Sequence, residues 1–477
     1  MNYLWTSDEL VSAMHGRPYG SLPEGVTGIS IDSRSIGKGE AFFAIKGDRV
    51  DGHDYASVAS ANGAALLVVS EAKLPALGRV TTPMIVVDDV LAGLERLGRA
   101  ARVRSAAKVI AITGSVGKTT TKEMLRKALE SSGTVHASVA SFNNHWGVPL
   151  TLARMPKDVD YGVFEIGMNH AGEIRALVSM VRPDIAIITT VAGAHLGNFR
   201  SVEEIAYAKS EILEGIQADG HAILNRDIEY FPILEKVAIE NRVPHIHSFG
   251  NNARADFRLA EFNGHPTSSN LWAVIGGRTI EVTIGAPGRH IAENALAVLG
   301  AVSLAGADLD RAAEALASFM PEKGRGQRHI LSLGEGKGTF TLIDESYNAN
   351  PASMRAAIGL LAGTPATGEG RQIAVLGDML EMGENSPSIH GNLAQPLRQA
   401  GIKHLWLAGR DMRLLAEAMA GSADVAYRQT AEELAEYAVS HVSDGDVLVV
   451  KSSLGTGFGK ITAALLSAFQ PANLAGV

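Results

Sequence analysis

Short hydrophobic runs, separated by polar and glycine-containing segments, recur along the whole chain. Near the start, residues 64–70 (AALLVVS) and 84–87 (MIVV) are typical of buried strands. A basic stretch at residues 96–108 has a helical pattern and leads into a different arrangement. We therefore predict a first α/β domain over residues 1–106.

Strand-like and helical segments alternate in the middle of the chain. The predicted strands are residues 109–113, 161–166, 184–191 and 221–224. A helix is expected from about residue 118 to 131. Such alternation implies a mostly parallel sheet with helices on both faces. We place this second domain at residues 107–325, ending in the charged, glycine-containing stretch 321–328.

The last part of the chain repeats the α/β rhythm. Its predicted strands are residues 339–343, 373–376, 404–407 and 447–450. We predict a third, Rossmann-like α/β domain over residues 326–477. The length of 477 residues agrees with about three domains. The predicted fold class is therefore α/β with three domains.

The segment 113–120 (TGSVGKTT) carries the sharpest chemical signal. It lies between a hydrophobic run and a helical pattern, the context in which a loop binds phosphate through backbone N–H groups and a helix N-terminus. Lys118 is expected to contact the β- and γ-phosphates, and the Thr119 hydroxyl to hold Mg²⁺. Ile112 replaces the first glycine of the usual string, which leaves a structural turn as the alternative. The predicted ATP-binding residues here are Gly114, Ser115, Val116, Gly117, Lys118, Thr119 and Thr120.

Three further residues are weaker candidates on the pattern alone. Glu165 ends a hydrophobic strand and is well placed to bind Mg²⁺ beside a phosphate loop. His195 follows another predicted strand, and the pattern favours a surface-loop histidine. Lys209 lies in a helical segment, where the pattern favours a solvated lysine paired with Glu204 or Glu211.

Composition narrows the class of protein. The net charge of −8 argues against a sequence-independent nucleic-acid binder, which needs a basic face. The chain has no cysteine, which excludes disulfides and thiolate catalysis. No secretory signal and no hydrophobic run of about 18 residues is visible. We therefore expect a cytoplasmic protein without a membrane span.

Several strings together resemble the Mur ligase superfamily along almost the whole chain. In the first domain these are residues 32–34 (DSR), 39–42 (GEAF) and 47–53 (GDRVDGH). The resemblance implies a domain that binds a UDP-linked muramoyl peptide through Ser33 and Arg34. A hydroxyl and a planar cation suit a diphosphate or uracil.

In the middle domain the family's phosphate loop reads T-G-x-x-G-K-[ST], which residues 113–119 match. The resemblance implies that Asn143 and Asn144 bind substrate and that Asn294 lies on the adenine side. Ile291 replaces an expected asparagine there. The resemblance also implies a catalytic and metal-binding set: Lys118, Thr119, Glu165, His195 and Lys209, with Lys209 present as a carbamate.

The third domain carries residues 343–354 (IDESYNANPASM), which resemble the D-D-S-Y-N-A-N-P string of one branch of the superfamily. Arg325 and Asp344 are thereby implied in ATP binding. Tyr347, Asn348 and Asn350 are implied near the reacting groups. Residues 377–383 (GDMLEMG) with His390 match as well, whereas residues 451–453 (KSS) depart from the usual K-G-S.

The activity that the resemblance implies is an ATP-dependent amide ligase of peptidoglycan synthesis. It joins D-alanyl-D-alanine to UDP-N-acetylmuramoyl-tripeptide through an acyl phosphate, with ATP and two Mg²⁺ ions. The expected protein is a monomer with these small-molecule partners. Two alternatives stay open: another ligase of the superfamily, such as a folate polyglutamate ligase, and a phosphate-loop switch protein without ligase activity. The base that deprotonates the incoming amine is not identified.

Overall fold

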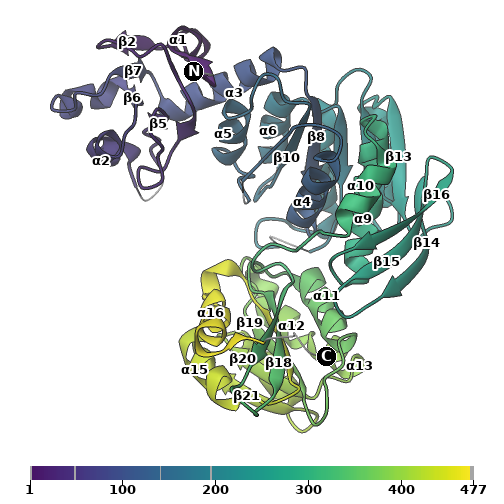
Figure 1. The fold of residues 1–477 in the computed structure, drawn as a ribbon. Helices are drawn as coiled ribbons and strands as arrows, with labels where there is room; N and C mark the ends of the chain where they lie inside the picture. The colour runs from purple at the N-terminus through teal and green to yellow at the C-terminus, as the bar shows by residue number, and fades with distance from the viewer. Residues whose placement is uncertain (1–2, 48–49, 140, 194–195, 473–477) are drawn as a thin grey trace.

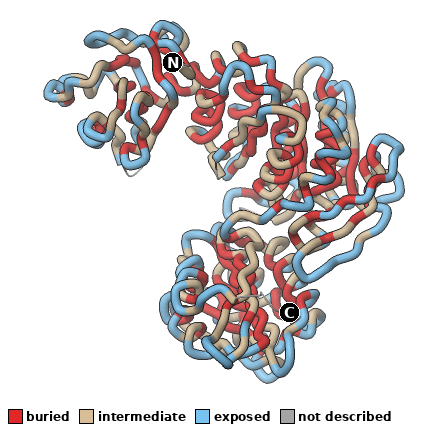
Figure 2. Tube along the Cα trace, viewed as in Figure 1, coloured by how far each residue is buried: buried red, intermediate tan, exposed pale blue. Residues whose placement is uncertain are grey.

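A computed structural model describes residues 3–47, 50–139, 141–193 and 196–472 of the 477-residue chain. Three lobes follow one another along an arc, with the first lobe at one end and the third at the other (Figure 1). Each lobe has its own sheet and its own buried interior, which the tube coloured by burial makes visible (Figure 2). The α/β fold class with three lobes is confirmed.

The first lobe is built on a five-stranded sheet in the order β2-β7-β6-β5-β4. Only β2 runs antiparallel to its neighbour. The strands of this lobe are β1 (Trp5–Thr6), β2 (Arg17–Tyr19), β3 (Gly25–Val26), β4 (Ile29–Ser30), β5 (Ala41–Phe43), β6 (Leu66–Ser70) and β7 (Met84–Val87). Its helices are α1 (Ser7–Met14), α2 (Ala56–Ala61) and α3 (Val90–Arg104). Both strands predicted here are present.

Helix α3 differs from the predicted helical stretch at both ends. It begins at Val90 because the Asp89 carboxylate caps it, accepting a 2.7 Å hydrogen bond from the Ala92 N–H. It ends at Arg104, and Lys108 already starts a strand. The predicted stretch followed the run of arginines, which starts only at Arg96, after the first turn of the helix. The domain boundaries at 106/107 and 325/326 stay a prediction.

The central lobe contains a nine-stranded sheet in the order β16-β15-β14-β13-β12-β11-β8-β10-β9. The strands are β8 (Lys108–Thr113), β9 (Val135–Ala137), β10 (Tyr161–Glu165), β11 (Ile185–Ile188), β12 (His221–Asn225), β13 (His245–Gly250), β14 (Phe257–Gly264), β15 (Ser269–Ile275) and β16 (Arg278–Ile284). In the order of the sheet, all neighbouring strands from β9 through β10, β8, β11, β12 and β13 to β14 are parallel. Strands β14, β15 and β16 form an antiparallel meander. The mostly parallel sheet is confirmed, and the antiparallel extension was not predicted.

Helices cover both faces of the central sheet, as predicted. One hydrophobic core lies under α4 (Lys118–Leu129), α9 (Arg289–Leu304) and α10 (Leu309–Leu316). The opposite core lies under α5 (Gly147–Ala153), α6 (Glu173–Val181), α7 (Val202–Ser210) and α8 (Phe231–Glu240). Strand β11 (IAII) is buried at every position because it packs against both cores.

The third lobe has a seven-stranded sheet in the order β21-β20-β19-β22-β18-β17-β23. Its strands are β17 (Gln327–Ser332), β18 (Thr339–Glu345), β19 (Gln372–Gly377), β20 (His404–Ala408), β21 (Asp424–Arg428), β22 (Val447–Lys451) and β23 (Gln470–Pro471). One core of this lobe lies under helices α11 (Pro351–Ala362), α12 (Ser386–Gly391), α13 (Ala394–Gln399) and α14 (Met412–Met419). The other core lies under α15 (Ala431–His441) and α16 (Gly459–Ala468). All four predicted strands of this part are present.

The first two lobes are joined through aromatic and cationic side chains. The Trp5 indole N–H donates to the Ala153 carbonyl oxygen at 2.8 Å. The Arg104 guanidinium, which lies 3.2 Å above the Trp5 ring within the first lobe, donates from Nη2 to the Met155 carbonyl oxygen at 3.3 Å. Arg154 Nε donates to the Ile29 carbonyl oxygen at 2.7 Å. These contacts fasten the first sheet to helix α5 of the second lobe.

The connection between the second and third lobes is fixed at its far end by Asp344 of β18. The Asp344 carboxylate accepts from the Gly324 N–H at 3.1 Å, and its carbonyl oxygen accepts from the Gly326 N–H at 2.8 Å. The Tyr347 N–H donates to the Gly324 carbonyl oxygen at 3.1 Å. Residues 324–326 are therefore hydrogen-bonded to β18 and to the segment that follows it in the third lobe.

None of the described helices combines the length and the hydrophobicity that crossing a membrane requires.

Candidate active site

The phosphate-loop segment connects the end of β8 to the start of α4, as its sequence predicts. Gly117 caps α4 with φ +88°, and a Cβ there would lie 2.9 Å from Asn294 Nδ2. Both the backbone angle and the close approach therefore require glycine at this position. Gly114 is similarly close to Thr189. The loop is wedged between β11 and helix α9.

Hydrogen bonds from the neighbouring strand hold the loop in place. The Ser115 N–H donates to the Thr190 carbonyl oxygen at 2.8 Å, and the Thr189 hydroxyl donates to the Val116 carbonyl oxygen at 2.6 Å. The Lys118 ammonium donates to the Gly114 carbonyl oxygen at 2.8 Å. Burial lowers the pKa of Lys118, and nearby Glu165 opposes that shift while Arg325 adds to it. A bound polyphosphate would restore the balance of charge around Lys118.

Glu165 lies at the carboxyl end of β10, beside the first turn of α4. Its side chain is 1% exposed. One carboxylate oxygen accepts from the Thr119 hydroxyl at 2.8 Å and the other from Asn143 Nδ2 at 2.7 Å. Three residues predicted from sequence, Thr119, Asn143 and Glu165, thus meet at one point.

Lys209 lies on α7 and is only 3% exposed, so the interpretation as a solvated lysine is wrong. Burial lowers its pKa well below the usual value, and repulsion from Lys118 lowers it further. Among the described residues no hydrogen-bond or ion-pair partner of its ammonium is found. Burial and repulsion both favour the neutral amine relative to the amine of an exposed lysine. His195 lies outside the described residues.

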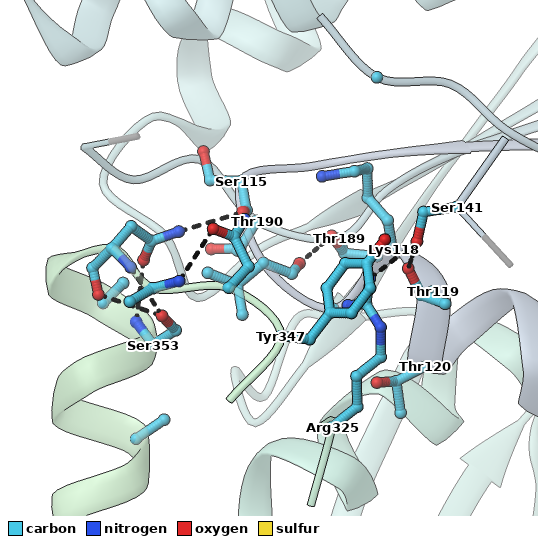
Figure 3. Close-up of a pocket in the computed structure, with 18 of the residues that line it drawn as sticks. Ser115, Lys118, Thr119, Thr120, Ser141, Thr189, Thr190, Arg325, Tyr347 and Ser353 are labelled. Carbon is cyan, nitrogen blue, oxygen red and sulfur yellow. Dashed lines mark hydrogen bonds between the residues drawn. The ribbon is translucent and has the colours of Figure 1, made fainter. Parts of the chain in front are cut away.

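Side chains of the third lobe reach the phosphate loop from the other side (Figure 3). Arg325 Nη2 donates to the Ser141 hydroxyl at 2.8 Å, and its guanidinium lies 4.1 Å from the centre of the Tyr347 ring. Asn350 Nδ2 donates to the Ser115 carbonyl oxygen at 3.3 Å. Asn350 also caps helix α11 through its pairing with Ser353. The third lobe therefore contributes directly to the phosphate-loop surroundings.

A buried ion pair lies behind Asn348. Lys451, at the end of β22, is 2% exposed and lies 3.2 Å from the Glu345 carboxylate on the paired strand β18. Its ammonium also donates to the Asn348 carbonyl oxygen at 2.8 Å. Sequence reasoning did not assign a role to Lys451, although it noted the departure of residues 451–453 from the expected string.

These residues surround a cavity of about 710 Å³ between the second and third lobes. Its lining includes the predicted Ser115, Val116, Gly117, Lys118, Thr119, Thr120, Asn143, Asn144, Glu165, Asn294, Arg325, Tyr347, Asn348 and Asn350. Sequence reasoning missed Ser141, Glu345, Glu381 and Lys451, which also line it. Ser141 could have been found from its place two residues before Asn143.

Other predicted residues lie elsewhere. Asp344 is 1% exposed, holds Gly324, Ser346 and Thr462 through its carboxylate, and is not among the described residues that line the cavity. Ser33 and Arg34 lie in the first lobe, apart from the cavity. The Arg34 guanidinium pairs with Asp32 at 2.7 Å, and this hydrogen bonding lowers the pKa of Asp32 to about 2. The roles of all three stay predictions.

Family models match three successive parts of the chain. Residues 25–102 match a model described as Mur ligase family, catalytic domain. Residues 112–302 match the Mur ligase middle domain, and residues 324–454 match the Mur ligase, glutamate ligase domain.

Curated and solved relatives cover nearly the whole chain. A UDP-N-acetylmuramoyl-tripeptide–D-alanyl-D-alanine ligase of Rickettsia prowazekii is 33% identical, over 91% of this chain and 94% of that protein. The Escherichia coli protein of the same name is 34% identical, over 82% and 83%. A crystal structure of MurF from Acinetobacter baumannii superimposes with a TM-score of 0.83 at 30% identity, covering 97% of this chain and 99% of that one.

Proposed function

This chain belongs to the Mur ligase family, and we propose that it is the member that joins D-alanyl-D-alanine to UDP-N-acetylmuramoyl-tripeptide at the expense of ATP. The product is the pentapeptide precursor used in peptidoglycan synthesis. One observation carries the proposal: the phosphate loop and residues 347–350 (YNAN) of the third lobe line the same cavity. A solved relative from Thermotoga maritima, with a TM-score of 0.75, was crystallised with ADP.

The reaction has two steps. A carboxylate oxygen of the tripeptide attacks the γ-phosphorus of ATP, the bond to the ADP oxygen breaks, and an acyl phosphate forms. The amine of D-alanyl-D-alanine then attacks the acyl carbon, loses a proton, and expels inorganic phosphate to leave an amide. The proton acceptor in this second step is His195, a carboxylate or the departing phosphate.

The first step brings two anions together, so cationic and N–H groups must face the phosphates. The backbone N–H groups of the loop and the N-terminus of α4 suit the polyphosphate. Lys118 neutralises charge on the transferred phosphoryl oxygens, and it leaves the Gly114 carbonyl to do so. Arg325, held over Tyr347, adds a second cation on the side of the third lobe.

The donor set around Glu165 fits Mg²⁺. Glu165 is a buried carboxylate whose two hydrogen-bond donors, Thr119 and Asn143, are neutral, and no cationic side chain of the described residues lies within ion-pair distance. Burying an uncompensated carboxylate is unfavourable, and a divalent cation offsets that cost. No three His, Asp or Glu side chains of the described residues converge on a metal. Thr119 and Glu165 would therefore hold Mg²⁺ together with phosphate oxygens, where it neutralises phosphoryl charge.

A second Mg²⁺ would involve Lys209 and His195. A buried, neutral Lys209 amine is a nucleophile for CO₂, and the resulting carbamate carries the negative charge that the region lacks. The carbamate would also remove the repulsion between Lys209 and Lys118. We assign Asn294 and Asp344 to binding of the nucleotide. The residues that we assign to the peptide and its UDP group are Ser33, Arg34, Asn143, Asn144, Tyr347, Asn348 and Asn350.

A UDP-linked substrate and ATP both point to the cytoplasm, and a monomer suffices because one chain supplies both sides of the cavity. The alternative ligases of the superfamily differ in the acceptor that they require. A phosphate-loop switch protein would hydrolyse ATP without any acceptor.

The experiment that tests the proposal is a phosphate-release assay in which each substrate is omitted in turn. Phosphate release should require ATP, UDP-N-acetylmuramoyl-tripeptide and D-alanyl-D-alanine together, with stoichiometric amide formation by mass spectrometry. Turnover that needs L-glutamate or diaminopimelate instead of the dipeptide, or none of them, would refute it.

A further inference from the structure

A tight turn of the third lobe projects into the cavity with an acidic side chain at its tip. The turn follows β19 and includes Leu380, Glu381 and Met382, all three of which line the cavity. The Glu381 carbonyl oxygen accepts from the Gly197 N–H of the second lobe at 2.9 Å. The turn therefore stands where the second and third lobes meet.

Glu381 adopts an unusual backbone conformation. Its φ is +62°, in the left-handed region that residues other than Gly, Asn and Asp rarely occupy. Such a conformation is unfavourable for glutamate and persists only where the surroundings impose it. The sequence has glycine nearby, at Gly383, but keeps glutamate at the strained position.

The base of the turn is fastened by buried groups. His390 is 0% exposed, and its Nε2 accepts from the Met379 N–H at 2.8 Å. The Leu380 N–H donates to the Ser453 hydroxyl at 3.0 Å, and the Ser452 hydroxyl donates to the Asp378 carbonyl oxygen at 3.0 Å. These bonds fix the direction in which the turn presents the side chain of Glu381.

Six carboxylate side chains are among the described residues that line the cavity. Glu165 holds Thr119 and Asn143, Glu173 holds Asn169 and His170, Asp227 holds Asn251 and Asn252, Glu293 holds Asn251 and Arg289, and Glu345 holds Lys451. Glu381 has interactions of its own as well. Its distinction is an exposed side chain on a strained, anchored turn at the junction of the lobes.

Hydrophobic side chains flank Glu381 on the cavity wall. Leu380 is 45% exposed and Leu454 is 62% exposed, although both are large hydrophobic residues. Gly455 lies against Leu380, since a Cβ on Gly455 would be 2.9 Å from the Leu380 side chain. An anion beside small hydrophobic surfaces suits a ligand that carries an ammonium group next to methyl groups.

We propose that Glu381 binds the terminal ammonium group of the incoming D-alanyl-D-alanine and that Leu380 and Leu454 contact its methyl groups. This inference rests on the proposed function. The carboxylate holds the amine of the dipeptide at the junction of the lobes, facing the acyl carbon, until the amine loses its proton. Glu381 is thereby a specificity-determining residue for the acceptor and has no part in binding ATP.

The test compares Glu381→Gln with the matched control Glu384→Gln, which changes an exposed carboxylate on the same turn that is not among the described residues lining the cavity. Losing a hydrogen bond between charged groups should raise the KM for D-alanyl-D-alanine about tenfold to hundredfold in Glu381→Gln. The KM values for ATP and for the UDP-linked tripeptide should stay within about twofold. Glu384→Gln should match the unaltered chain.

A second probe isolates the ammonium group. D-lactyl-D-alanine carries a hydroxyl in place of the amine and should inhibit competitively. The unaltered chain should prefer the dipeptide over this analogue, and Glu381→Gln should lose most of that preference. Both ligands are compared on the same protein, so a general effect of the substitution on folding cancels in the ratio of the two.

Three outcomes would overturn the inference. One is an unchanged KM for the dipeptide in Glu381→Gln, or an equal change in Glu384→Gln. Another is a rise confined to the KM for the UDP-linked tripeptide, which would assign Glu381 to an amine of that substrate. If the unaltered chain shows no dipeptide-dependent phosphate release, the proposed function fails together with the inference.

Discussion

Buried ionisable side chains lie on the cavity wall, at Glu165 and Lys118, and behind it, at Lys209, which interacts electrostatically with Lys118 but is not among the described residues that line the cavity. Glu165 and Lys209 are 1% and 3% exposed, and burial also lowers the pKa of Lys118. An interior of low polarity disfavours each charge unless an opposite charge arrives. The substrates supply that charge, so the local instability of the empty cavity favours binding.

Glu165→Gln keeps the shape of the side chain and removes its charge. We expect ligase turnover to fall about 10²–10³-fold, because a charge that organises the phosphoryl-transfer site is lost. The melting temperature in EDTA should stay the same or rise, since an uncompensated buried charge disappears. Phosphate release and thermal unfolding measure the two effects.

The matched control for this prediction is Glu130→Gln on the exposed end of helix α4, where the carboxylate pairs only with Arg126 at the surface. It should change neither quantity. Full turnover in Glu165→Gln at ordinary Mg²⁺ concentrations would contradict the role of Glu165.

Lys209→Ala tests the carbamate. Burial lowers the pKa of Lys209 and so favours the neutral amine, the form that combines with CO₂, and the carbamate would supply a negative charge. We expect turnover to fall about a hundredfold or more and to return in part when formate or acetate is added. Lys209→Arg, which cannot form a carbamate, should be inactive and should not respond to these acids. Unchanged turnover in Lys209→Ala would rule the carbamate out.

At this scale the sequence placed Thr119 and Glu165 together, because both were expected to bind Mg²⁺ beside the phosphate loop. The contact of Asn143 with Glu165 was not predicted, since Asn143 was expected to bind substrate. The sequence could not reveal that Lys209 is buried, since its neighbours Glu204 and Glu211 are those of a solvated helix. Glu381 was also out of reach, because a positive φ at glutamate leaves no mark in composition.

At the scale of elements, strands β12 and β13 carry a histidine cluster near their N-terminal ends. Parallel register places His221 opposite His245, and His221 Nδ1 lies 3.1 Å from His247 Nε2. Burial lowers the pKa of His221, and His247, His245 and Lys108 lower it further, while Asp184 opposes the shift. Burial also lowers the pKa of His247, and Asp256 opposes this.

These shifts predict a loss of stability as the pH falls. In the window below the ordinary histidine pKa of 6.5, the unfolded chain binds protons that the folded cluster rejects, so the free energy of unfolding decreases with falling pH. Once the pH is below the lowered pKa values, this loss is complete. Urea unfolding at pH 7.5 and 5.5 should show a smaller difference in His221→Asn than in the unaltered chain.

His15→Asn is the control for the cluster. His15 ends helix α1 with φ +55°, a conformation that asparagine tolerates, and it lies outside the cluster. Its pH dependence should equal that of the unaltered chain. An unaltered difference in His221→Asn would show that the cluster does not control stability.

The elements that sequence reasoning identified are the strands buried on both faces. Residues 84–87 and 373–376 are continuous hydrophobic runs, and such runs stand out. Strands β14 to β16 alternate buried and exposed positions in a meander covered on one face by α9 and α10, and their polar residues hid them. The two-residue pairing of β23 with β17 gives no signal either.

For the molecule as a whole, the first lobe is attached to the second more firmly than the third lobe is. Trp5 and Arg104 of the first lobe and Arg154 of the second lobe join the first pair by donating hydrogen bonds to backbone carbonyl oxygens across the junction. The second and third lobes meet through side chains that border the cavity, Arg325 and Asn350 among them. We therefore expect the third lobe to move against a unit made of the other two.

Small-angle X-ray scattering measures this motion. An ATP analogue together with the UDP-linked tripeptide should lower the radius of gyration of the unaltered chain. The double variant Arg325→Ala/Asn350→Ala should stay expanded, because it lacks the contacts to Ser141 and Ser115. Scattering profiles that do not respond to the two ligands would contradict the closure.

The hydrogen bonds between residues 324–326 and Asp344 have a consequence for the hydrolysis of ATP. Because residues 324–326 bond to Asp344 and Tyr347, we expect Arg325 to move with the third lobe, which would withdraw one of the two cations from the phosphate loop. Glu381, which we assign to the acceptor, returns on the same lobe. We therefore expect little ATP hydrolysis while the third lobe is withdrawn from the phosphate loop.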